Sequence, residues 1–352
     1  MIRATAGGLE AFAAAALRSL GVGEPDAALA AGVMVRTDLR GIRTHGVHML
    51  PRYAGQVREG GVDPRAETVT VRETAATALL DGGGGLGQVV ASRATALAIE
   101  KALAHDLAVV SVRNSSHLGA CGHYALLLAE AGLVGLVFSS TPVIMKVAGS
   151  RGRVIGNGPT AWSAPCAPRP PLVFDAAMSV VAGQKVILHL ERGEPLPEGW
   201  IVDAQGLPTR DPAAFRAGGA LVPIGDHKGS GLALLGEVLS GVLSGGAVAS
   251  AVWSGGNAAR PDVSHALVAL NPEAFGPLPD FERRANALVD EIHSAAPGPG
   301  CDRVLVPGEL EHEAERAGLE RGVEFDEVAW GLLAELAGDL SVQDLLEEAR
   351  IG

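Results

Sequence analysis

A strand, a turn and a helix follow one another between residues 107 and 131, and this segment constrains the chain most. Residues 107–112 are apolar and predict a buried strand, and residues 125–131 predict a helix. His117 lies in the turn between them, with glycines nearby. Ligands of α/β proteins gather at the carboxyl ends of strands, where a histidine can exchange a proton near neutral pH. The alternative is a histidine that only hydrogen-bonds its own turn.

Composition favours an α/β enzyme. The chain has 352 residues, of which 47% are hydrophobic and only 4% are aromatic, so a large aliphatic core can form. The net charge of −12 argues against nucleic-acid binding, which needs a basic surface. We expect the protein to work in the cytoplasm, because its three cysteines are scattered and the sequence has no signal-like or membrane-spanning apolar run.

The hydrophobic pattern alternates between helices and strands along most of the chain. We expect helices at 9–20, 24–39, 50–59, from Gln88 to about 105, and at 125–131, 179–190, 229–243 and 280–295. Strands or extended segments are expected at 68–72, 76–81, 107–112, 133–139, 154–162, 172–175 and 266–271. Residues 191–215 are rich in proline, glycine and charge and predict an excursion from the core, and the C-terminal part is helical and acidic.

Gly82, Gly84 and Gly87 match the spacing of a dinucleotide-binding loop between a strand and a helix. Glu100 or Asp106 lies near the position of a ribose-binding acid, about 20 residues on. However, four successive glycines match many patterns by chance, and a long segment precedes the loop. The alternative is a flexible turn that leads into a helix.

Eight segments together resemble the malate/L-lactate dehydrogenase family of nicotinamide-dependent oxidoreductases, which differs from the Rossmann-type lactate and malate dehydrogenases. This family includes ureidoglycolate, sulfolactate and malate dehydrogenases and cyclic imino acid reductases. The matching segments run in order at residues 40–53, 81–88, 114–124, 155–159, 175–182, 192–200, 225–232 and 306–309. The resemblance favours the flexible-turn reading of the glycine loop.

The resemblance implies an α/β fold with a family-specific, non-Rossmann NAD(P)-binding domain and a mostly helical second lobe made from both chain ends. We expect residues 1–75 and 310–352 to form the helical, substrate-side lobe and residues 76–309 the cofactor-binding domain. The resemblance also implies a homodimer.

The resemblance assigns proton transfer to His117, with His45 as a second catalytic histidine. A carbonyl that receives a hydride gains negative charge on oxygen, and an imidazolium can neutralise it. The expected substrate-side residues, which can donate hydrogen bonds or line the site, are Thr44, His48, Met49, Arg52 and Tyr53. For Tyr53 the alternative is helix packing, and for His45 it is capping of a turn.

Met49 departs from the family pattern, in which an arginine four residues after His45 pairs with a substrate carboxylate. The carboxylate clamp is therefore either absent or replaced by Arg43, His48 or Arg52. We expect a bulkier or less acidic substrate end near Met49, in place of a simple hydroxy diacid.

The resemblance also implies contacts with NAD or NADP, which the sequence does not distinguish. The expected cofactor-side residues are Thr141, Asp175, Ala176, Ala177, His227, Lys228, Gly229, Gly308 and Glu309. The backbone at the helix start near Lys228, together with its charge, suits a pyrophosphate; the alternative is a basic helix start without a ligand. Gly158 departs from the family's usual asparagine before proline.

Other chemistries have little support. The ten histidines form no convincing metal-binding spacing, and His45 with His48 is the nearest chance pair. No nucleophilic serine motif follows a strand with clear partners. The chain is therefore expected to interconvert a 2-hydroxy acid and a 2-oxo acid with a small-molecule substrate. The alternatives are reduction of a cyclic imino acid or N-alkyl imine, and a non-catalytic metabolite-binding relative.

Overall fold

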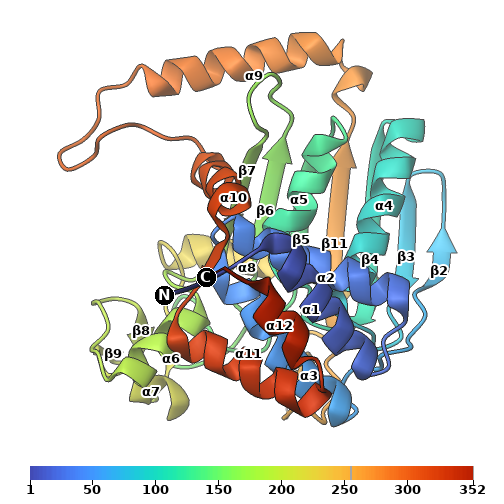
Figure 1. Cartoon of the computed structure of the whole chain (residues 1–352). Helices are drawn as coiled ribbons and strands as arrows, with labels where there is room; N and C mark the ends of the chain where they lie inside the picture. The colour runs from blue at the N-terminus through green and yellow to red at the C-terminus, as the bar shows by residue number, and fades with distance from the viewer. Residues whose placement is uncertain (254–255, 352) are drawn as a thin grey trace.

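A seven-stranded mixed sheet forms the centre of the computed structural model, which describes residues 1–253 and 256–351 (Figure 1). Its strand order is β2 (Val69–Glu73), β3 (Thr77–Asp81), β4 (Leu107–Ser115), β11 (Val263–Leu270), β5 (Val134–Ser139), β6 (Thr160–Ala164) and β7 (Leu172–Ala176). β3 and β4 pair in parallel, and the other neighbours pair antiparallel. The expected α/β class is confirmed, and β11 brings the later half of the chain between β4 and β5.

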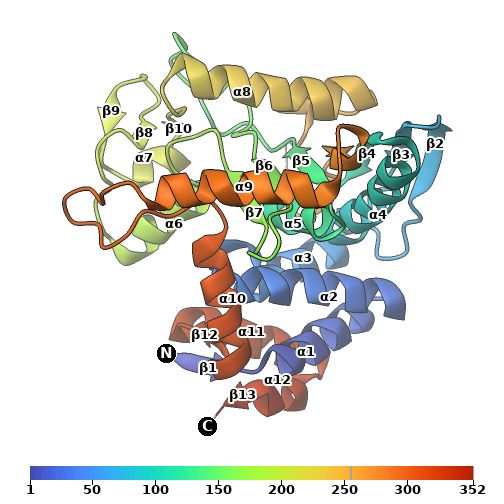
Figure 2. The same ribbon diagram turned by 90° about the horizontal axis from the view of Figure 1, so that it is seen from above.

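Helices cover both faces of this sheet. α4 (Gly87–His105) and α5 (Cys121–Glu130) pack on one face, and α8 (His227–Glu237) lies on the other (Figure 2). α8 continues into a π-helical turn at Val238–Val242 that contacts β11. Buried alanines of α4 pack with the valines of β4, so the pattern of small apolar residues that predicted this helix forms the core beneath it.

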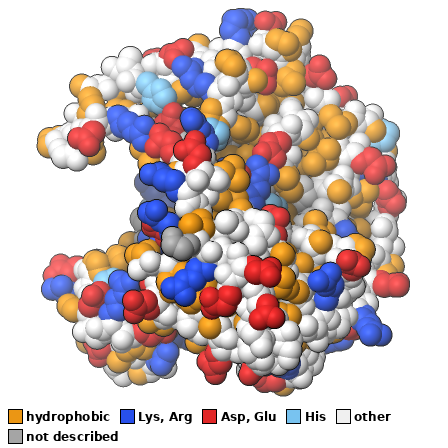
Figure 3. Space-filling model, viewed as in Figure 1, with side chains coloured by type: hydrophobic (Ala, Val, Ile, Leu, Met, Phe, Trp, Pro, Cys, Tyr) orange, Lys and Arg blue, Asp and Glu red, His pale blue; other side chains and the backbone are white. Residues whose placement is uncertain are grey.

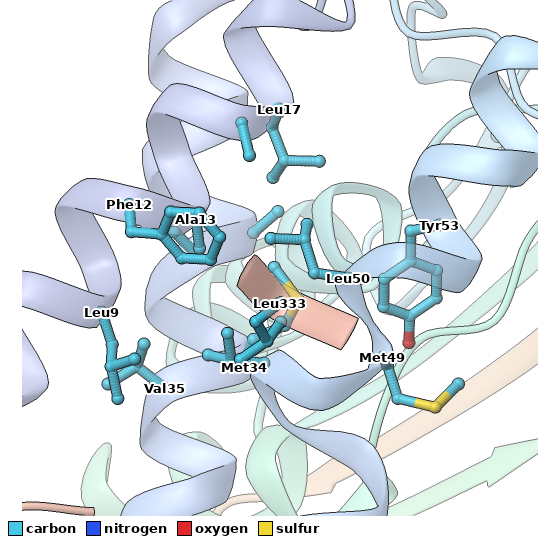
Figure 4. Packing of buried hydrophobic residues seen from close by; sticks show 14 of the residues in the cluster. Leu9, Phe12, Ala13, Leu17, Met34, Val35, Met49, Leu50, Tyr53 and Leu333 are labelled. Atoms are coloured by element: carbon cyan, nitrogen blue, oxygen red, sulfur yellow. The ribbon is translucent and has the colours of Figure 1, made fainter. Parts of the chain in front are cut away.

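The two chain ends pack together. α1 (Ala6–Ser19), α2 (Glu24–Leu39), α3 (Leu50–Arg58), α11 (Glu327–Leu340) and α12 (Gln343–Ala349) share one hydrophobic cluster. Figure 4 shows α1, α2 and α3 side chains converging with Leu333 in this cluster. β1 (Ile2–Ala4) pairs with β12 (Val323–Phe325) and β13 (Arg350–Ile351). The division into two domains stays a prediction; β2, placed before its boundary at residue 75, lies in the large sheet.

The remaining elements surround this frame. A small sheet has the order β10 (Ala220–Leu221), β8 (Ile201–Val202) and β9 (Pro208–Thr209), and it lies within and beside the predicted excursion. The other helices are α6 (Gly183–Arg192), α7 (Ala213–Arg216), α9 (Leu278–His293) and α10 (Glu309–Arg321). Figure 3 shows a hollow between the segment that joins α9 to α10 and the region of α6, α7 and the small sheet. Within the described residues, no helix is long and apolar enough to cross a membrane.

Three predicted elements begin or extend elsewhere, and the first two differences have a long-range cause. α5 begins at Cys121, four residues early, because Asp175 of β7 accepts a hydrogen bond from the Gly122 N–H group at 2.7 Å. α6 begins only at Gly183, because the Val180 N–H group bonds to the carbonyl of Val222. In the segment 154–162, only residues from 160 onward join the large sheet.

Candidate active site

His117 lies where β4 leads into α5, and two hydrogen bonds orient its ring. The Gly119 N–H group donates to His117 Nδ1 at 3.3 Å, so Nδ1 is an acceptor. The Tyr53 hydroxyl therefore donates to the same nitrogen, at 2.8 Å. The neutral ring carries its proton on Nε2, which has no hydrogen-bond partner among the described residues. This leaves Nε2 available to a ligand.

His45 stacks on His117, with ring centroids 5.5 Å apart and an interplanar angle of 20°. Burial lowers the pKa of His117 well below its usual range, and the nearby His45, Arg52 and His265 side chains lower it further. Burial, with His48 and Arg52, lowers the pKa of His45 to about 4. Both rings are therefore neutral at pH 7 in the free protein.

Asp38 of α2 holds the short 3₁₀ turns Arg43–His45 and Val47–Met49 that carry His45. The Val47 N–H group donates to Asp38 Oδ2 at 2.7 Å. Gly46 must be a glycine here, because an added Cβ atom would lie 1.9 Å from Asp38 Oδ1. Burial raises the pKa of Asp38 to about 7. The sequence did not single out Asp38, since nothing local shows that it faces this turn.

The other expected substrate-side residues lie along the same turns and α3. Thr44 Oγ1 lies 2.8 Å from His45 Nδ1. Met49 is only 3% exposed and belongs to the hydrophobic cluster, and Figure 4 shows it close to the Tyr53 side chain. His48 and Arg52 are half-buried, and burial lowers the pKa of both. The structure thus brings His45, Tyr53 and His117 together directly, while substrate contact stays a prediction.

The glycine loop supports the turn that carries His117. The N–H groups of Gly82 and Gly84 donate to the carbonyls of Arg113 and Asn114 at the end of β4. The Gly87 N–H group donates to Ser116 Oγ at 2.8 Å. A Cβ atom at Gly87 would lie 2.3 Å from the Ser116 carbonyl oxygen. These contacts favour the structural interpretation of the loop, although it is packed against β4 and is no loose turn.

His265 of β11 is completely buried beneath the same turn and was missed from the sequence. Its Nδ1 lies 2.9 Å from Ser139 Oγ on β5, and its Nε2 lies 3.0 Å from Ser115 Oγ on β4. One side chain therefore links three strands just below His117. A lone histidine in an apolar run gives no local signal of this role, because both partners are more than 100 residues away in sequence.

Thr141 follows β5 and holds the turn before β6. Its Oγ1 donates to Asn157 Oδ1 at 2.9 Å and accepts from the Asn157 N–H group at 3.0 Å. Gly158 has φ +50°, and an added Cβ atom would lie 2.8 Å from the Ala233 Cα atom of α8. The glycine in place of the family's asparagine therefore lets α8 approach this turn closely.

The other expected cofactor-side residues lie on three further elements. Asp175, at the end of β7, caps α5, and Ala176 and Ala177 follow it half-buried. Glu309 Oε2 accepts a hydrogen bond from the Val306 N–H group at 2.9 Å and lies close to His293, at the start of α10. Gly308 precedes it with φ +99° and packs against Val173 of β7.

His227 and Lys228 are exposed at the start of α8, and Gly229 is buried. The N–H groups of Lys228 and Gly229 bond to the carbonyls of Gly225 and Ile224. Side-chain charge at this helix start is therefore more accessible to an anion than these two backbone groups, and binding of a pyrophosphate here stays a prediction. Among the described residues, no group of three or more His, Cys, Asp or Glu side chains is placed to hold a metal ion.

Comparison with known proteins identifies the family. The model of the malate/L-lactate dehydrogenase family matches residues 5–334. Malate dehydrogenase of Pyrococcus abyssi is 36% identical over 344 residues, 96% of this chain and 94% of that protein. The solved malate dehydrogenase of Pyrococcus horikoshii OT3 has a TM-score of 0.89 at 33% identity, covering 97% of this chain and 96% of that one.

A solved reductase is also similar in structure. It is Δ1-piperideine-2-carboxylate reductase of Pseudomonas syringae pvar. tomato, with a TM-score of 0.87 at 29% identity, covering 96% of this chain and all (100%) of that one. The shared fold and the match over nearly the whole length confirm the resemblance that the sequence motifs carried. This chain belongs to the malate/L-lactate dehydrogenase family and is an oxidoreductase.

Proposed function

We propose that this protein is an NAD(P)-dependent oxidoreductase that interconverts a 2-hydroxy acid and a 2-oxo acid, with His117 as the acid/base. The observation that carries the proposal is the orientation of His117. Tyr53 and Gly119 both bond to Nδ1, so Nε2 has no hydrogen-bond partner among the described residues and is available to a ligand. A ring held in this way can exchange a proton with a substrate oxygen.

The residues at the start of α8 and after β5 fit an anionic dinucleotide. His227 and Lys228 are exposed, and neither forms an ion pair with a described carboxylate, although the chain has a net charge of −12. We propose that Lys228 and His227 hold the phosphates, while Thr141, with Asp175, Ala176 and Ala177, lies beside the rest of the cofactor. Gly308 and Glu309 complete this set. When bound, the nicotinamide supplies or accepts the hydride.

His117 then transfers the proton, and His45 and Tyr53 support its ring. In reduction, the protonated imidazolium form of His117 gives its Nε2 proton to the oxygen of the carbonyl whose carbon receives the hydride, and the ring keeps its other proton on Nδ1. In oxidation, Nε2 of that neutral tautomer takes the proton from the substrate hydroxyl group. Tyr53 keeps the ring in place through the 2.8 Å contact with Nδ1. Burial raises the pKa of Tyr53, so its hydroxyl stays un-ionised and can donate to an unprotonated Nδ1 or accept from a protonated one. His45 stacks on the ring and contributes a second polar edge toward the substrate.

A second candidate is reduction of a C=N bond in a cyclic imino acid or N-alkyl imine. The similarity to the piperideine-carboxylate reductase favours it as an alternative. The same His117 proton would then go to the imine nitrogen in place of an oxygen.

Oxidation of NADH and NADPH at 340 nm, measured against a panel of 2-oxo acids and cyclic imines, tests the proposal. We expect turnover with a 2-oxo acid, and the better cofactor identifies NAD or NADP. Turnover only with imines would select the reductase. An absence of both dinucleotide binding and turnover would favour a non-catalytic relative and contradict the proposal.

We further propose a homodimer formed through α8 and its π-helical extension. Six large apolar side chains there are at least 43% exposed: Leu232, Leu234, Leu235, Val238, Val242 and Leu243. We expect light scattering to give twice the mass of one chain, and Leu234→Glu to shift it toward one chain. A wild-type monomer at micromolar concentration would contradict this interface.

The three cysteines support a reducing compartment. Cys121 and Cys166 are buried thiols and Cys301 is an exposed one, and all three are free. We therefore propose that the enzyme works in the cytoplasm, where thiols stay reduced.

A further inference from the structure

Arg52 is a half-buried cation whose guanidinium has no carboxylate or hydrogen-bond acceptor in the described part of the chain. It lies in the first turn of α3, next to Tyr53. No described carboxylate forms an ion pair with it, whereas Arg36 of α2, which is also half-buried, and Arg40, which follows that helix, both pair with Glu315. A guanidinium taken partly out of water carries five N–H donors that need acceptors. Its position therefore points to an acceptor that is supplied by a ligand.

Trp253 orients this guanidinium. The Arg52 Cζ atom lies 5.3 Å from the centre of the Trp253 ring, within the range of a cation–π contact. The indole N–H group donates to the Gly256 carbonyl at 3.3 Å, which holds the ring. Trp253 lies between α8 and β11, far from α3 in the sequence. An arginine supported on an aromatic face keeps its planar fork of N–H groups for a planar anion.

The two other candidates for a replacement clamp are less suited. Arg43 is exposed and pairs with Glu324 at 3.4 Å. Burial lowers the pKa of His48, so this side chain is neutral at pH 7. Arg52, in contrast, is near enough for its charge to lower the pKa of both His45 and His117. It is also three residues after Met49, and on a helix such positions share a face.

We propose that Arg52, held by Trp253, binds the C1 carboxylate of the substrate and replaces the arginine that Met49 displaces. This inference rests on the proposed function, and it adds Trp253 as a positioning residue. The bidentate fork matches a carboxylate, so the site selects 2-oxo acids over their esters and amides. Because Met49 is apolar and buried, position 49 offers no second cation beside Arg52 for the other acidic group of a diacid.

The same contact links binding to proton transfer. Without substrate, the Arg52 charge disfavours a proton on His117. A carboxylate bound to Arg52 offsets that charge. Substrate binding therefore raises the proton affinity of His117 at the step in which a proton is needed.

The test compares Arg52→Met, Arg52→Lys and Trp253→Leu with Arg58→Met, a matched control that removes an exposed arginine from the last turn of the same helix. The probes are the best 2-oxo acid of the panel, its methyl ester, and oxamate, an unreactive anionic analogue. We expect Arg52→Met to raise KM for the acid about 100-fold, the size of a lost charged hydrogen-bond pair. Arg52→Lys and Trp253→Leu should each raise it about tenfold, and Arg58→Met should leave it unchanged.

The KM for the methyl ester distinguishes carboxylate binding by Arg52 from a merely structural role of this residue. Its KM should be the same in the wild type and in Arg52→Met, because it lacks the C1 charge. An unchanged KM for the acid in Arg52→Met, or an equal rise for the ester, would overturn the inference.

Calorimetric titration with oxamate separates this inference from the proposed function. If the wild type binds oxamate and Arg52→Met does not, yet no 2-oxo acid is reduced, the carboxylate site stands and the dehydrogenase proposal fails. If oxamate binds both proteins equally, the proposed carboxylate site is wrong. The site is also wrong if oxamate binds neither protein in the presence of NADH or NADPH.

Discussion

Replacing His117 with asparagine is expected to lower kcat about 1,000-fold, the usual size of a lost general acid/base. Asparagine can still accept hydrogen bonds from Tyr53 and Gly119, which meet at His117 Nδ1 in the wild type. It cannot carry a proton to the substrate oxygen. The measurement is steady-state oxidation of NADH or NADPH with the best 2-oxo acid.

Two controls define what that loss means. The dinucleotide should bind His117→Asn as tightly as the wild type, since the replaced ring lies on the substrate side of the proposed site. Tyr53→Phe removes the 2.8 Å hydrogen bond to His117 but leaves its proton, so kcat should fall less. If His117→Asn keeps more than a tenth of wild-type turnover, another group transfers the proton.

Gly87→Ala is expected to destabilise the protein by about 3 kcal/mol, as overpacking of a tight contact does. The new Cβ atom would lie 2.3 Å from the Ser116 carbonyl oxygen and 2.5 Å from backbone atoms of His117, neither of which can move as a flexible side chain can. The turn must shift, so kcat should fall as well. Thermal denaturation and the 340 nm assay measure the two effects.

Gly32→Ala is the matched control, because Gly32 lies inside α2 with open space around its Cβ position. An alanine there should stabilise the helix by about 0.5–1 kcal/mol. If both substitutions have the same small effect, the glycine loop does not support the His117 turn as described.

Local pattern was sufficient where a segment's own residues decide its structure. The limits of α2 at residues 24 and 39 match the prediction, because Pro25 suits a first turn and Gly41 follows the last one. β4 and β5 come from apolar runs, and the turn that carries His117 follows directly from β4. The sequence predicted His117 and Tyr53 as site residues from two separate motifs, and only the structure shows that these two side chains form a hydrogen bond.

Features made by distant parts of the chain left no local sign. The start of α5 depends on Asp175, 53 residues later, which caps it through Gly122. β11 lies between β4 and β5, so the sheet is mostly antiparallel, and this position also brings His265 beneath His117. The contact between Trp253 and Arg52 of α3 likewise joins residues far apart in the sequence. Long-range pairing is decided by the whole core, and no window of sequence contains it.

The pH dependence of kcat/KM in both directions tests most directly whether His117, which is neutral in the free enzyme, supplies the proton in reduction. The groups facing His117 are His45, Arg52, Tyr53 and His265. Burial keeps the pKa of His117 well below 6.5, and the nearby His45, Arg52 and His265 side chains lower it further. Only the protonated fraction can reduce substrate, and that fraction falls as pH rises above the pKa.

We therefore predict that kcat/KM for reduction falls about tenfold per pH unit between pH 6 and 8, while kcat/KM for oxidation stays constant. The two slopes together account for the single proton in the overall reaction. Reduction that stays constant up to pH 8, with oxidation rising over the same range, would place the proton on a group of higher pKa and contradict the role of His117.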